Sequence, residues 1–240
     1  MMKRALVTGG TKGIGLAIAG MLLQEGYFVT TTYAGDEEAA NESRTVLSRI
    51  SNDFETLRID QSCKDDMHRL IRHLHEQQRI DCIICNAGVT LRKGITEFAD
   101  EEWERVMQVN VNAPVFLIRD LYDIIPCGSR IVFIGSEMAI HPHGTSLAYG
   151  VTKSAVHALA TNLVKFFEGT GTTINAVAPG FVETEWQKSK PEEIRNNIYR
   201  KTAVKRFATV DEIADAVKFC IGNAFVNGSV IEVSGGYCFK

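Results

Sequence analysis

The chain has 240 residues, of which 45% are hydrophobic and 23% are charged, and its formal net charge is −3. This size and apolar content suffice for one large α/β domain, or two small ones, with a sizeable core. The near-neutral charge argues against nucleic-acid binding and against an anionic membrane surface. No apolar run approaches the roughly 20 residues that span a bilayer, so we expect no membrane segment.

The cysteines and the N-terminus indicate a reducing compartment. The run Met1–Arg4 passes directly into a short apolar segment, so we expect no signal peptide. Cys82 and Cys85 have CxxC spacing, but the sequence around them is typical of a buried strand, and neither a second CxxC nor a zinc-spaced histidine accompanies them. We therefore expect packed free thiols, no metal and a cytoplasmic protein.

Short β-branched apolar runs alternate with longer amphipathic segments along the chain. The short runs predict strands at 4–8, 28–33, 55–59, 82–85, 130–135, 173–178 and 229–233, and the segments between them predict helices near 14–25, 36–50, 63–78, 101–125, 150–168 and 210–221. Strands that are apolar on both faces and separated by helices indicate a parallel sheet covered on both sides. We expect an α/β, doubly wound, Rossmann-like sheet of about seven strands in a single domain over residues 1–240.

The first predicted strand runs into a glycine-rich turn that precedes a helix. Glycines here allow a tight turn and a close approach of the backbone to a pyrophosphate, which faces the N–H groups at the helix N-terminus. The turn therefore predicts dinucleotide binding, and its candidate residues are Gly9, Thr11, Lys12, Gly13, Ile14 and Gly15.

The tip of the second strand predicts which dinucleotide is bound. Many dinucleotide folds place an acidic residue there, on the ribose hydroxyls. Here the strand ends at Tyr33-Ala34-Gly35 with no carboxylate, and Asp36 is interpreted as the opening turn of the next helix. A 2′-phosphate is then not repelled, and Lys12 can reach it, so the sequence favours NADP(H) over NAD.

Two further strand ends carry candidate cofactor contacts. Asp60 follows the third strand, where it either accepts a hydrogen bond from the adenine amino group or caps a turn. The turn Asn86-Ala87-Gly88 ends the fourth strand and would let the cofactor lie against the backbone.

Three residues have the chemistry and spacing of a reacting centre. Tyr149 and Lys153 are four apart, so a helix places them on one face. A nearby ammonium favours phenolate, so we expect Lys153 to lower the Tyr149 pKa toward the working range. Ser136 follows the fifth strand, at the edge of the sheet where α/β proteins bind ligands. Its hydroxyl could hold the substrate oxygen beside Tyr149.

Two loop segments near this centre have open interpretations. Residues 184–206 are polar and helix-permissive after a strand's carboxyl end, so they form either a substrate lid or an ordinary pair of surface helices. His141 and His143 either line the substrate mouth or are exposed loop residues.

These motifs resemble the short-chain dehydrogenase/reductase family, in its compact branch, over essentially the whole chain. The resemblance rests on the glycine turn, Asn86-Ala87-Gly88, Asn110, Ser136, Tyr149-x-x-x-Lys153, Pro179-Gly180 and Ser234-Gly235-Gly236. The segment 175–184 looks very like that of 3-oxoacyl-[acyl-carrier-protein] reductases.

The resemblance implies a role for each matching residue. Tyr149 would donate the proton in reduction, Lys153 would hold the nicotinamide ribose, and Ser136 would orient the carbonyl. Asn110 would support a water that links Lys153 to solvent. Val182 and Thr184 would meet the nicotinamide carboxamide, next to Pro179 and Gly180.

Departures from the carrier-protein reductases leave the substrate open. Where such enzymes often carry basic residues that dock an acidic carrier, this chain has 127–129 and 169–172, which contain none. The resemblance implies a small-molecule carbonyl substrate, and a small ketone, a polyketide-like ring, a steroid, a sugar alcohol or an acyl thioester all stay open. The family also implies a homotetramer, packed through helices 101–125 and 150–168.

The alternatives are an NAD-dependent alcohol dehydrogenase of a catabolic route and a dinucleotide-binding regulator without catalysis. The intact Ser136, Tyr149 and Lys153 argue against the regulator. A sugar epimerase or dehydratase would need a larger C-terminal substrate domain than the 61 residues after Pro179 provide.

Overall fold

The computed structural model describes residues 2–142, 146–188 and 190–237. Its strands form one parallel seven-stranded sheet in the order β3-β2-β1-β4-β5-β6-β7. The strands are β1 (Arg4–Val7), β2 (Phe28–Tyr33), β3 (Phe54–Arg58), β4 (Cys82–Cys85), β5 (Arg130–Ile134), β6 (Thr173–Pro179) and β7 (Val230–Val233).

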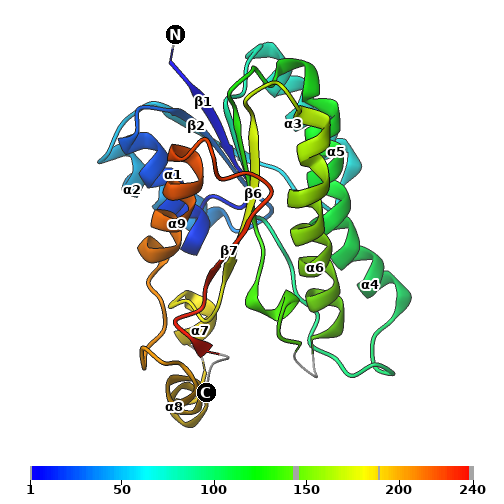
Figure 1. The fold of residues 1–240 in the computed structure, drawn as a ribbon, viewed down its shortest axis with the longest axis vertical. Coiled ribbons are helices and arrows are strands. Elements are labelled where there is room, and N and C mark those ends of the chain that lie inside the picture. The colour runs from blue at the N-terminus through cyan, green and yellow to red at the C-terminus, as the bar shows by residue number, and fades with distance from the viewer. Residues whose placement is uncertain (1, 143–145, 189, 238–240) are drawn as a thin grey trace.

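Helices alternate with the strands along the chain, as the sequence predicted. They are α1 (Gly13–Gln24), α2 (Glu37–Ser48), α3 (Lys64–Glu76), α4 (Asp100–Met107), α5 (Ala113–Asp120), α6 (Leu147–Asn162), α7 (Glu185–Lys188), α8 (Glu192–Lys201) and α9 (Val210–Gly222). Helices α1, α2 and α9 cover one face of the sheet, and α3, α5 and α6 cover the other (Figure 1). The expected doubly wound α/β architecture is therefore confirmed.

Each face of the sheet has its own apolar core. On one side Val29 and Ile84 pack with Ile18 of α1 and Val217 of α9. On the other side Phe133 packs among residues of α3, α5 and α6. Strands β4 and β6 are buried along their whole length, which explains why their sequences lack a polar alternation.

The helix expected over 101–125 is helical without interruption from Asp100 to Asp120, but it contains a π-turn and ends earlier than predicted. Helix α4 ends at Met107, a π-helical turn occupies Gln108–Asn112, and α5 ends at Asp120, before a short 3₁₀ turn. A π-turn inserts a residue into the helical repeat and often marks a functional position. Asn110 lies inside this turn.

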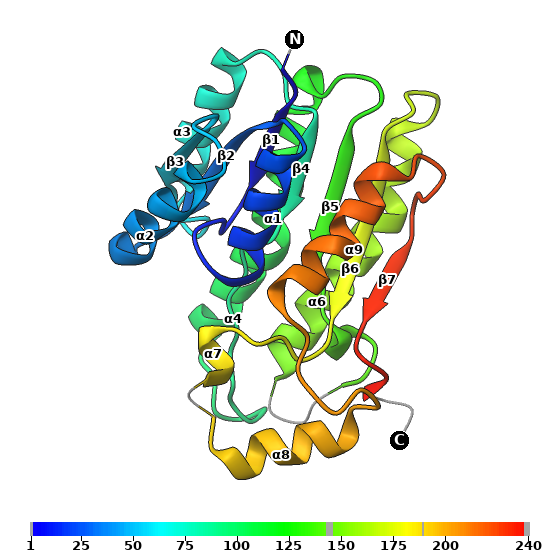
Figure 2. The ribbon, with the colours of Figure 1, turned by 90° about the vertical axis from the view of Figure 1, so that its left-hand side faces the viewer.

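The carboxyl ends of all seven strands meet at one edge of the sheet. The chain reverses its strand order beside β1 and β4, which creates the crevice where such sheets bind ligands. Helices α7 and α8 lie beyond this edge, below the end of β6 (Figure 2). The fold thus gathers the loops after β1, β4, β5 and β6 around one crevice.

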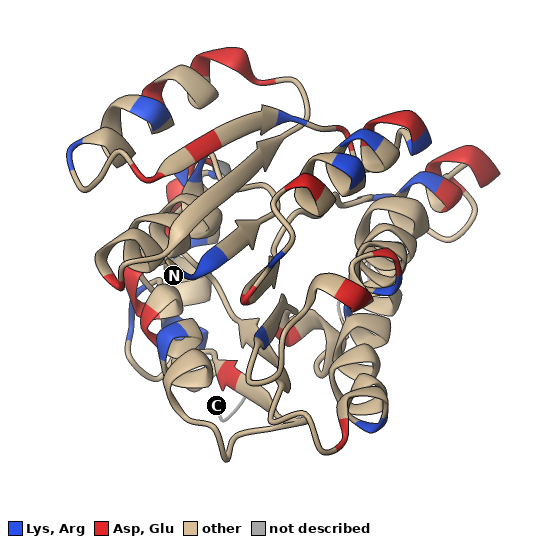
Figure 3. Cartoon of the chain, turned by 90° about the horizontal axis from the view of Figure 1, so that it is seen from above, with Lys and Arg blue, Asp and Glu red and all other residues tan. Residues whose placement is uncertain are grey.

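Charged residues of both signs are interspersed on the outer helices (Figure 3). Ion pairs link several of them, including Arg206 with Glu212 and Lys218 with Glu25. Among the described residues, no helix is both long and apolar enough to cross a membrane.

Candidate active site

The turn after β1 requires glycine at several positions. Gly9 and Gly13 have φ values of +62° and +54°, in the left-handed region that favours glycine. A Cβ on Gly15 would lie 2.2 Å from the Gly9 carbonyl oxygen, and a Cβ on Gly9 would lie 3.0 Å from Cα of Ala87. Side chains are therefore excluded where this turn meets the turn after β4.

Thr8 and Asn86 tie these two turns together. The Thr8 hydroxyl accepts hydrogen bonds from the backbone N–H groups of Asn86 and Ala87, both at 3.0 Å. The Asn86 side-chain amide donates to the carbonyl oxygens of Thr8 and Gly9, both at 2.9 Å. The turn at residues 86–88 thus forms a fixed wall beside the glycine turn.

A cleft extends from the glycine turn to the ends of β2 and β3. It gathers eight of the residues that the sequence assigned to the cofactor, namely Gly9, Thr11, Lys12, Tyr33, Asp60, Asn86, Ala87 and Gly88. Its remaining walls are Thr32, Ala34, Gly35, Asp36, Ile59, Gln61, Val89, Arg105 and Val109.

An ion pair that the sequence did not predict occupies the mouth of this cleft. Asp36 caps α2 by accepting a hydrogen bond from the Ala39 N–H at 3.0 Å, as expected for a residue that opens a helix. Its other carboxylate oxygen lies 2.5 Å from the Lys12 ammonium. The hydrogen bond from Lys12 is the main reason why the pKa of Asp36 lies below its usual range. The cation expected to reach a 2′-phosphate therefore already contacts a carboxylate.

Asp60 and Gln61 lie side by side in the chain but differ in their contacts. One Asp60 carboxylate oxygen accepts from the Ser62 N–H at 2.8 Å and from the Ser62 hydroxyl at 2.7 Å, which is the turn-capping arrangement. Gln61 is only 4% exposed, and neither its amide nitrogen nor its amide oxygen has a hydrogen-bond partner among the described residues.

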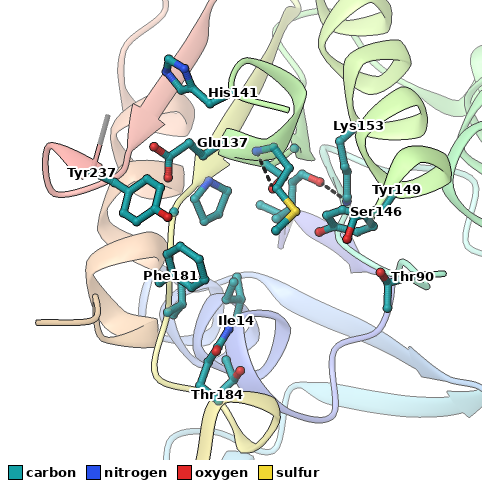
Figure 4. Close-up of a pocket in the computed structure, with 18 of the residues that line it drawn as sticks. Ile14, Thr90, Glu137, His141, Ser146, Tyr149, Lys153, Phe181, Thr184 and Tyr237 are labelled. Carbon is teal, nitrogen blue, oxygen red and sulfur yellow. Dashed lines mark hydrogen bonds between the residues drawn. The ribbon is translucent and has the colours of Figure 1, made fainter. Parts of the chain in front are cut away.

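A second cavity opens at the ends of β5 and β6 (Figure 4). It brings together eight further residues of the sequence-based site, namely Ile14, Ser136, Tyr149, Lys153, Pro179, Gly180, Val182 and Thr184. Gly13, Gly15 and Asn110, which the sequence also assigned to the site, are not among the lining residues of either cleft. The two clefts meet at the glycine turn, where a Cβ on Gly13 would lie 3.4 Å from Thr184 Cγ2.

Lys153 lies beneath the phenol ring of Tyr149. Its ammonium is 5.5 Å from the Tyr149 ring centroid and donates a 2.6 Å hydrogen bond to the Ile134 carbonyl oxygen at the end of β5. Ser136 is 9% exposed, and its hydroxyl accepts from the Met138 N–H at 3.2 Å. The structure therefore places all three predicted reacting groups at one end of the cavity.

Burial controls the pKa values of this pair. Burial raises the pKa of Tyr149 above its ordinary value, and a hydrogen bond with Ser136 offsets only part of that rise. Burial also lowers the pKa of Lys153 to about 8. The expected lowering of the Tyr149 pKa by the ammonium is therefore wrong for this state of the site, because desolvation of the phenolate dominates.

Asn110 uses its whole side-chain amide to connect three segments. The amide nitrogen donates to the Val89 carbonyl oxygen at 2.9 Å and to the Thr152 hydroxyl at 3.0 Å, and the amide oxygen accepts from the Val89 N–H at 2.8 Å. A Cβ on Gly88 would lie 3.4 Å from the Asn110 oxygen and 3.5 Å from the Lys153 nitrogen. Asn110 thus stands next to the reacting lysine, behind the turn after β4.

His157 is a site residue that the sequence analysis missed. Its Nε2 lies 3.3 Å from the Ser136 backbone nitrogen and accepts that N–H. Burial and the Lys153 charge lower the His157 pKa to about 4, so the ring is neutral near pH 7. The signal was available, because Tyr149, Lys153 and His157 recur every four residues on one face of α6.

The segment after β6 folds over the cavity end of the sheet. Val182 forms an isolated bridge with Ala208, so the two ends of the segment lie together. Within it, Arg195 of α8 forms a two-pronged ion pair with Glu183, at 2.5 and 3.0 Å. Gln187 and Lys190 from this segment line the same cavity as Tyr149.

Charged side chains that the sequence analysis did not assign also line this cavity. They are Arg92, Glu137 and Lys190. Tyr237 also lines the cavity, and so does His141, which the sequence placed either at the substrate mouth or in an exposed loop. Burial lowers the pKa of Lys190, and repulsion from Arg92 and Arg195 lowers it further. His141 is exposed at the rim, whereas His143 lies outside the described residues.

The two CxxC cysteines are buried in β4, and burial raises the pKa of each thiol to about 12. The residues that the structure describes contain no cluster of histidine, cysteine, aspartate and glutamate suited to a metal ion. Both thiols belong to the packed sheet.

Comparisons with known proteins agree on the family. The family model described as Enoyl-(Acyl carrier protein) reductase matches residues 9–238. Acetoacetyl-CoA reductase of Allochromatium vinosum is 30% identical, with 98% of each chain covered. The 3-oxoacyl-[acyl-carrier-protein] reductase FabG of Staphylococcus aureus is 28% identical over 98% of each chain.

Solved structures of known proteins indicate the same family. The angucycline C-6 ketoreductase LanV with bound NADP matches with a TM-score of 0.91 and 28% identity, covering 99% of this chain and 96% of that one. A short-chain dehydrogenase/reductase from Serratia marcescens matches with a TM-score of 0.91 and 27% identity, covering 98% and 97%. With the glycine turn, the Tyr149–Lys153 pair and the sheet order, these matches show that the chain belongs to the short-chain dehydrogenase/reductase family of nicotinamide-dinucleotide oxidoreductases.

Proposed function

We propose that this protein is an NADPH-dependent reductase that converts a carbonyl compound to a secondary alcohol, in the manner of 3-oxoacyl-[acyl-carrier-protein] reductases. The observation that carries the proposal is the placement of Ser136, Tyr149 and Lys153 in one cavity that adjoins the glycine turn. Relatives named as acetoacetyl-CoA and 3-oxoacyl reductases support a carbonyl substrate, which could be an acyl thioester.

The residues of the long cleft fit a dinucleotide. The positions of Gly9, Gly13 and Gly15 leave the backbone bare at the start of α1, where N–H groups and the helix dipole favour a pyrophosphate. Thr184 and Val182 lie where the cleft meets the reacting cavity, and we assign them to the carboxamide end. When bound, the reduced nicotinamide supplies the hydride.

The protein's part in the reaction is to hold the carbonyl and deliver a proton. Ser136 holds the carbonyl oxygen, and the Tyr149 hydroxyl donates its proton to that oxygen as hydride reaches the carbon. A raised pKa keeps Tyr149 protonated at neutral pH, so the proton is available. The Lys153 ammonium, 5.5 Å from the centre of the Tyr149 ring, stabilises the negative charge left on the phenolate.

Asn110 and the segment 184–206 complete the proposed machinery. We assign Asn110 to a water that links Lys153 to solvent, because among the described residues its amide oxygen accepts only one hydrogen bond, from Val89, and both this oxygen and the Lys153 nitrogen lie beside Gly88. We assign residues 184–206 as a substrate lid, because Gln187 and Lys190 line the reacting cavity.

The choice of NADPH rests on the absence of a carboxylate at the tip of β2 and on the nearby Lys12. LanV, a ketoreductase with bound NADP, supports it by likeness. The ion pair between Lys12 and Asp36 favours the second candidate, an NAD-dependent alcohol dehydrogenase, because a carboxylate at this place repels a 2′-phosphate. We place NADPH first because Asp36 is also engaged as the α2 cap and lies outside the strand tip.

We also propose a homotetramer. The apolar residues Val106 and Val109 are buried within the chain, but Phe116 of α5 and Val151 of α6 are 40% and 41% exposed. Phe166, just after α6, is 68% exposed. Light scattering coupled to sizing chromatography should give a mass of four chains, and a monomer would refute this part.

The function is tested by NADPH oxidation with a panel of ketones and acetoacetyl thioesters. Wild-type protein should turn over at least one of them, and Tyr149→Phe should lower kcat roughly 10²–10⁴-fold, the usual contribution of general acid–base catalysis. Calorimetry should show nearly unchanged NADPH binding by the variant. Equal turnover by the variant would remove Tyr149 from the chemistry, and cofactor binding without any turnover would favour the regulator.

A further inference from the structure

The reacting cavity carries an excess of positive charge. The described residues that line it include three cations, Arg92, Lys153 and Lys190, but one carboxylate, that of Glu137. Lys153 serves Tyr149 in the proposed reaction, whereas Arg92 and Lys190 have no part in it. A cleft lined by one sign of charge attracts a ligand of the opposite sign.

Lys190 lies at the cavity wall without an opposite charge beside it. Its ammonium is 5.1 Å from the centroid of the Phe181 ring, and it forms no ion pair with a carboxylate of the described chain. Arg195, in the same segment, differs because it forms a two-pronged ion pair with Glu183. An ammonium that is partly withdrawn from water and lacks an anion is electrostatically unfavourable. Lys190 is therefore suited to bind a negative group.

Arg92 comes from a different part of the chain but acts on the same space. It belongs to the loop after β4, whereas Lys190 belongs to the segment after β6. Burial lowers the pKa of Lys190, and the charges that lower it further, those of Arg92 and Arg195, are both positive. Burial raises the pKa of Tyr149, and the hydrogen bond with Ser136 and the charge of Arg92 offset part of that rise. Arg92 is therefore within electrostatic reach of both Lys190 and the reacting phenol.

The acidic residue of the cavity lies at another part of its wall. Glu137 is 5% exposed, and a Cβ on Gly180 would lie 2.8 Å from one of its carboxylate oxygens. Figure 4 shows Glu137 on the same side as Tyr237, across the cavity from Thr90, which precedes Arg92 in the loop after β4. The negative charge that Lys190 lacks therefore has to come from a ligand.

We infer that the carbonyl substrate carries an anionic group, which Arg92 and Lys190 bind while Ser136 and Tyr149 meet the carbonyl. A guanidinium binds a carboxylate or a phosphate through two parallel N–H groups, and an ammonium adds a point charge. A small oxo acid and a thioester with a phosphate on its arm both fit this chemistry. The inference rests on the proposed reduction of a carbonyl compound and specifies the class of that compound.

Pairs of substrates that differ in one charge test the inference. The series from 3-oxobutanoate to 6-oxoheptanoate is compared with the corresponding methyl esters, which keep the ketone and lose the charge. Acetoacetyl-phosphopantetheine is compared with acetoacetyl-pantetheine in the same way. In at least one pair the anionic member should have a kcat/KM roughly tenfold higher, as for one charge-assisted hydrogen bond. The pair that shows the difference identifies the anion as carboxylate or phosphate.

Glutamine variants assign the effect to the two cations. In the double variant Arg92→Gln, Lys190→Gln, the ratio of kcat/KM for the anionic member to that for the neutral member should fall roughly tenfold, mainly through KM. Lys93→Gln is the matched control, because Lys93 lies in the same loop but pairs with Glu102 at 2.7 and 2.8 Å and does not line the cavity. This variant should keep the wild-type ratio.

Three results would overturn the inference and leave the reductase in place. They are equal use of both members in every pair by the wild type, a wild-type ratio in the double variant, and equal losses with both members in that variant. The last result would mean that the cations act on Tyr149 and not on the substrate.

Hexanoate, which has the charge but no ketone, separates this inference from the proposed function. Calorimetry in the presence of NADP⁺ should show that it binds the wild type more tightly than hexanamide does, and that the double variant loses this difference. If the wild type reduces no carbonyl compound, the proposed function fails, and hexanoate binding still decides whether the anion site exists. Equal binding of hexanoate and hexanamide would then reject the site as well.

Discussion

The imidazole of His157 fills the space that a side chain on Gly135 would occupy. A Cβ built on Gly135 would lie 2.1 Å from His157 Nε2, the same nitrogen that accepts the Ser136 N–H. The bare backbone at position 135 and the histidine of α6 are thus a matched pair. Together they fix the end of β5, from which the Ser136 hydroxyl projects.

Gly135→Ala should therefore lower the free energy of unfolding by about 1–3 kcal/mol, because the added methyl overpacks against the imidazole. His157→Ala should cost about 1–3 kcal/mol for a different reason, since the buried Ser136 N–H loses its acceptor. Urea unfolding measures both changes.

The double variant separates the two causes. With His157→Ala in place, Gly135→Ala should cost less than it does alone, because the two imidazole contacts are gone and the Val177 carbonyl oxygen, at 3.3 Å, is the closest remaining contact for the methyl. Strictly additive losses would show that the two positions do not compete for space.

The rate of carbonyl reduction should fall as pH rises through about 8. The Lys153 pKa is lowered from 10.5 to about 8, so the ammonium is present below that pH and is lost above it. Without the ammonium, the phenolate formed on Tyr149 is not stabilised. The measurement is kcat between pH 6 and 10 at saturating NADPH and ketone.

Lys153→Met is the control for that profile. It should be slow at every pH and should lack the inflection near 8. A wild-type rate that stays level to pH 10 would exclude Lys153 as the titrating group.

Asp36→Asn should shift the cofactor preference toward NADPH. Asparagine still caps α2, but it no longer neutralises Lys12, so the ammonium is free to meet a 2′-phosphate. The ratio of kcat/KM for NADPH to that for NADH should rise roughly two- to fivefold, as for the loss of an exposed ion pair. Lys12→Ala should move the ratio the other way.

Glu38→Gln removes a carboxylate from the same helical turn and should leave the ratio unchanged. If Asp36→Asn lowers the NADPH preference, Lys12 and the tip of β2 do not favour a 2′-phosphate in the way proposed. A strong NADH preference in wild type would support the alcohol dehydrogenase.

Asn110→Ala should lower the unfolding free energy by about 1–3 kcal/mol, because both the N–H and the carbonyl of Val89 lose their partner. Asn112→Ala, in the same π-turn, removes only a 3.3 Å contact with Gln108 and should be nearly neutral. Thermal melting compares the two. Equal losses would indicate that the π-turn tolerates neither change and that the Val89 contacts are not the cause.

The sequence predicted the elements whose causes are local. The β-branched runs predicted the strands, and the glycine turn predicted the first crossover. The spacing of Tyr149 and Lys153 predicted that they share one face of a helix. The π-turn inside the helix at 101–125 could not be read from apolar periodicity, and neither could the hydrogen bonds of its Asn110 with Val89 and Thr152, which are 21 and 42 residues away.

The effects of burial could not be predicted from the sequence either. The direction of the Tyr149 pKa shift depends on how fully the phenol is desolvated, and the Lys12–Asp36 contact depends on how the turn after β1 lies against α2. Likewise, Gln61 is an ordinary polar residue in the sequence, and only its surroundings leave its amide unmet. The spacing of His157 could have been noticed, but its partner on β5 could not.

The anchoring of Lys153 has a consequence for how such a protein diversifies. Its ammonium is held by the carbonyl of Ile134, a residue of the central sheet, whereas much of the cavity wall comes from segments outside the sheet. Substitutions at residues such as Lys190 and His141 can therefore change which compounds bind, while the groups that transfer the proton stay in position. Substrate specificity can therefore evolve without any change in the residues that transfer the proton.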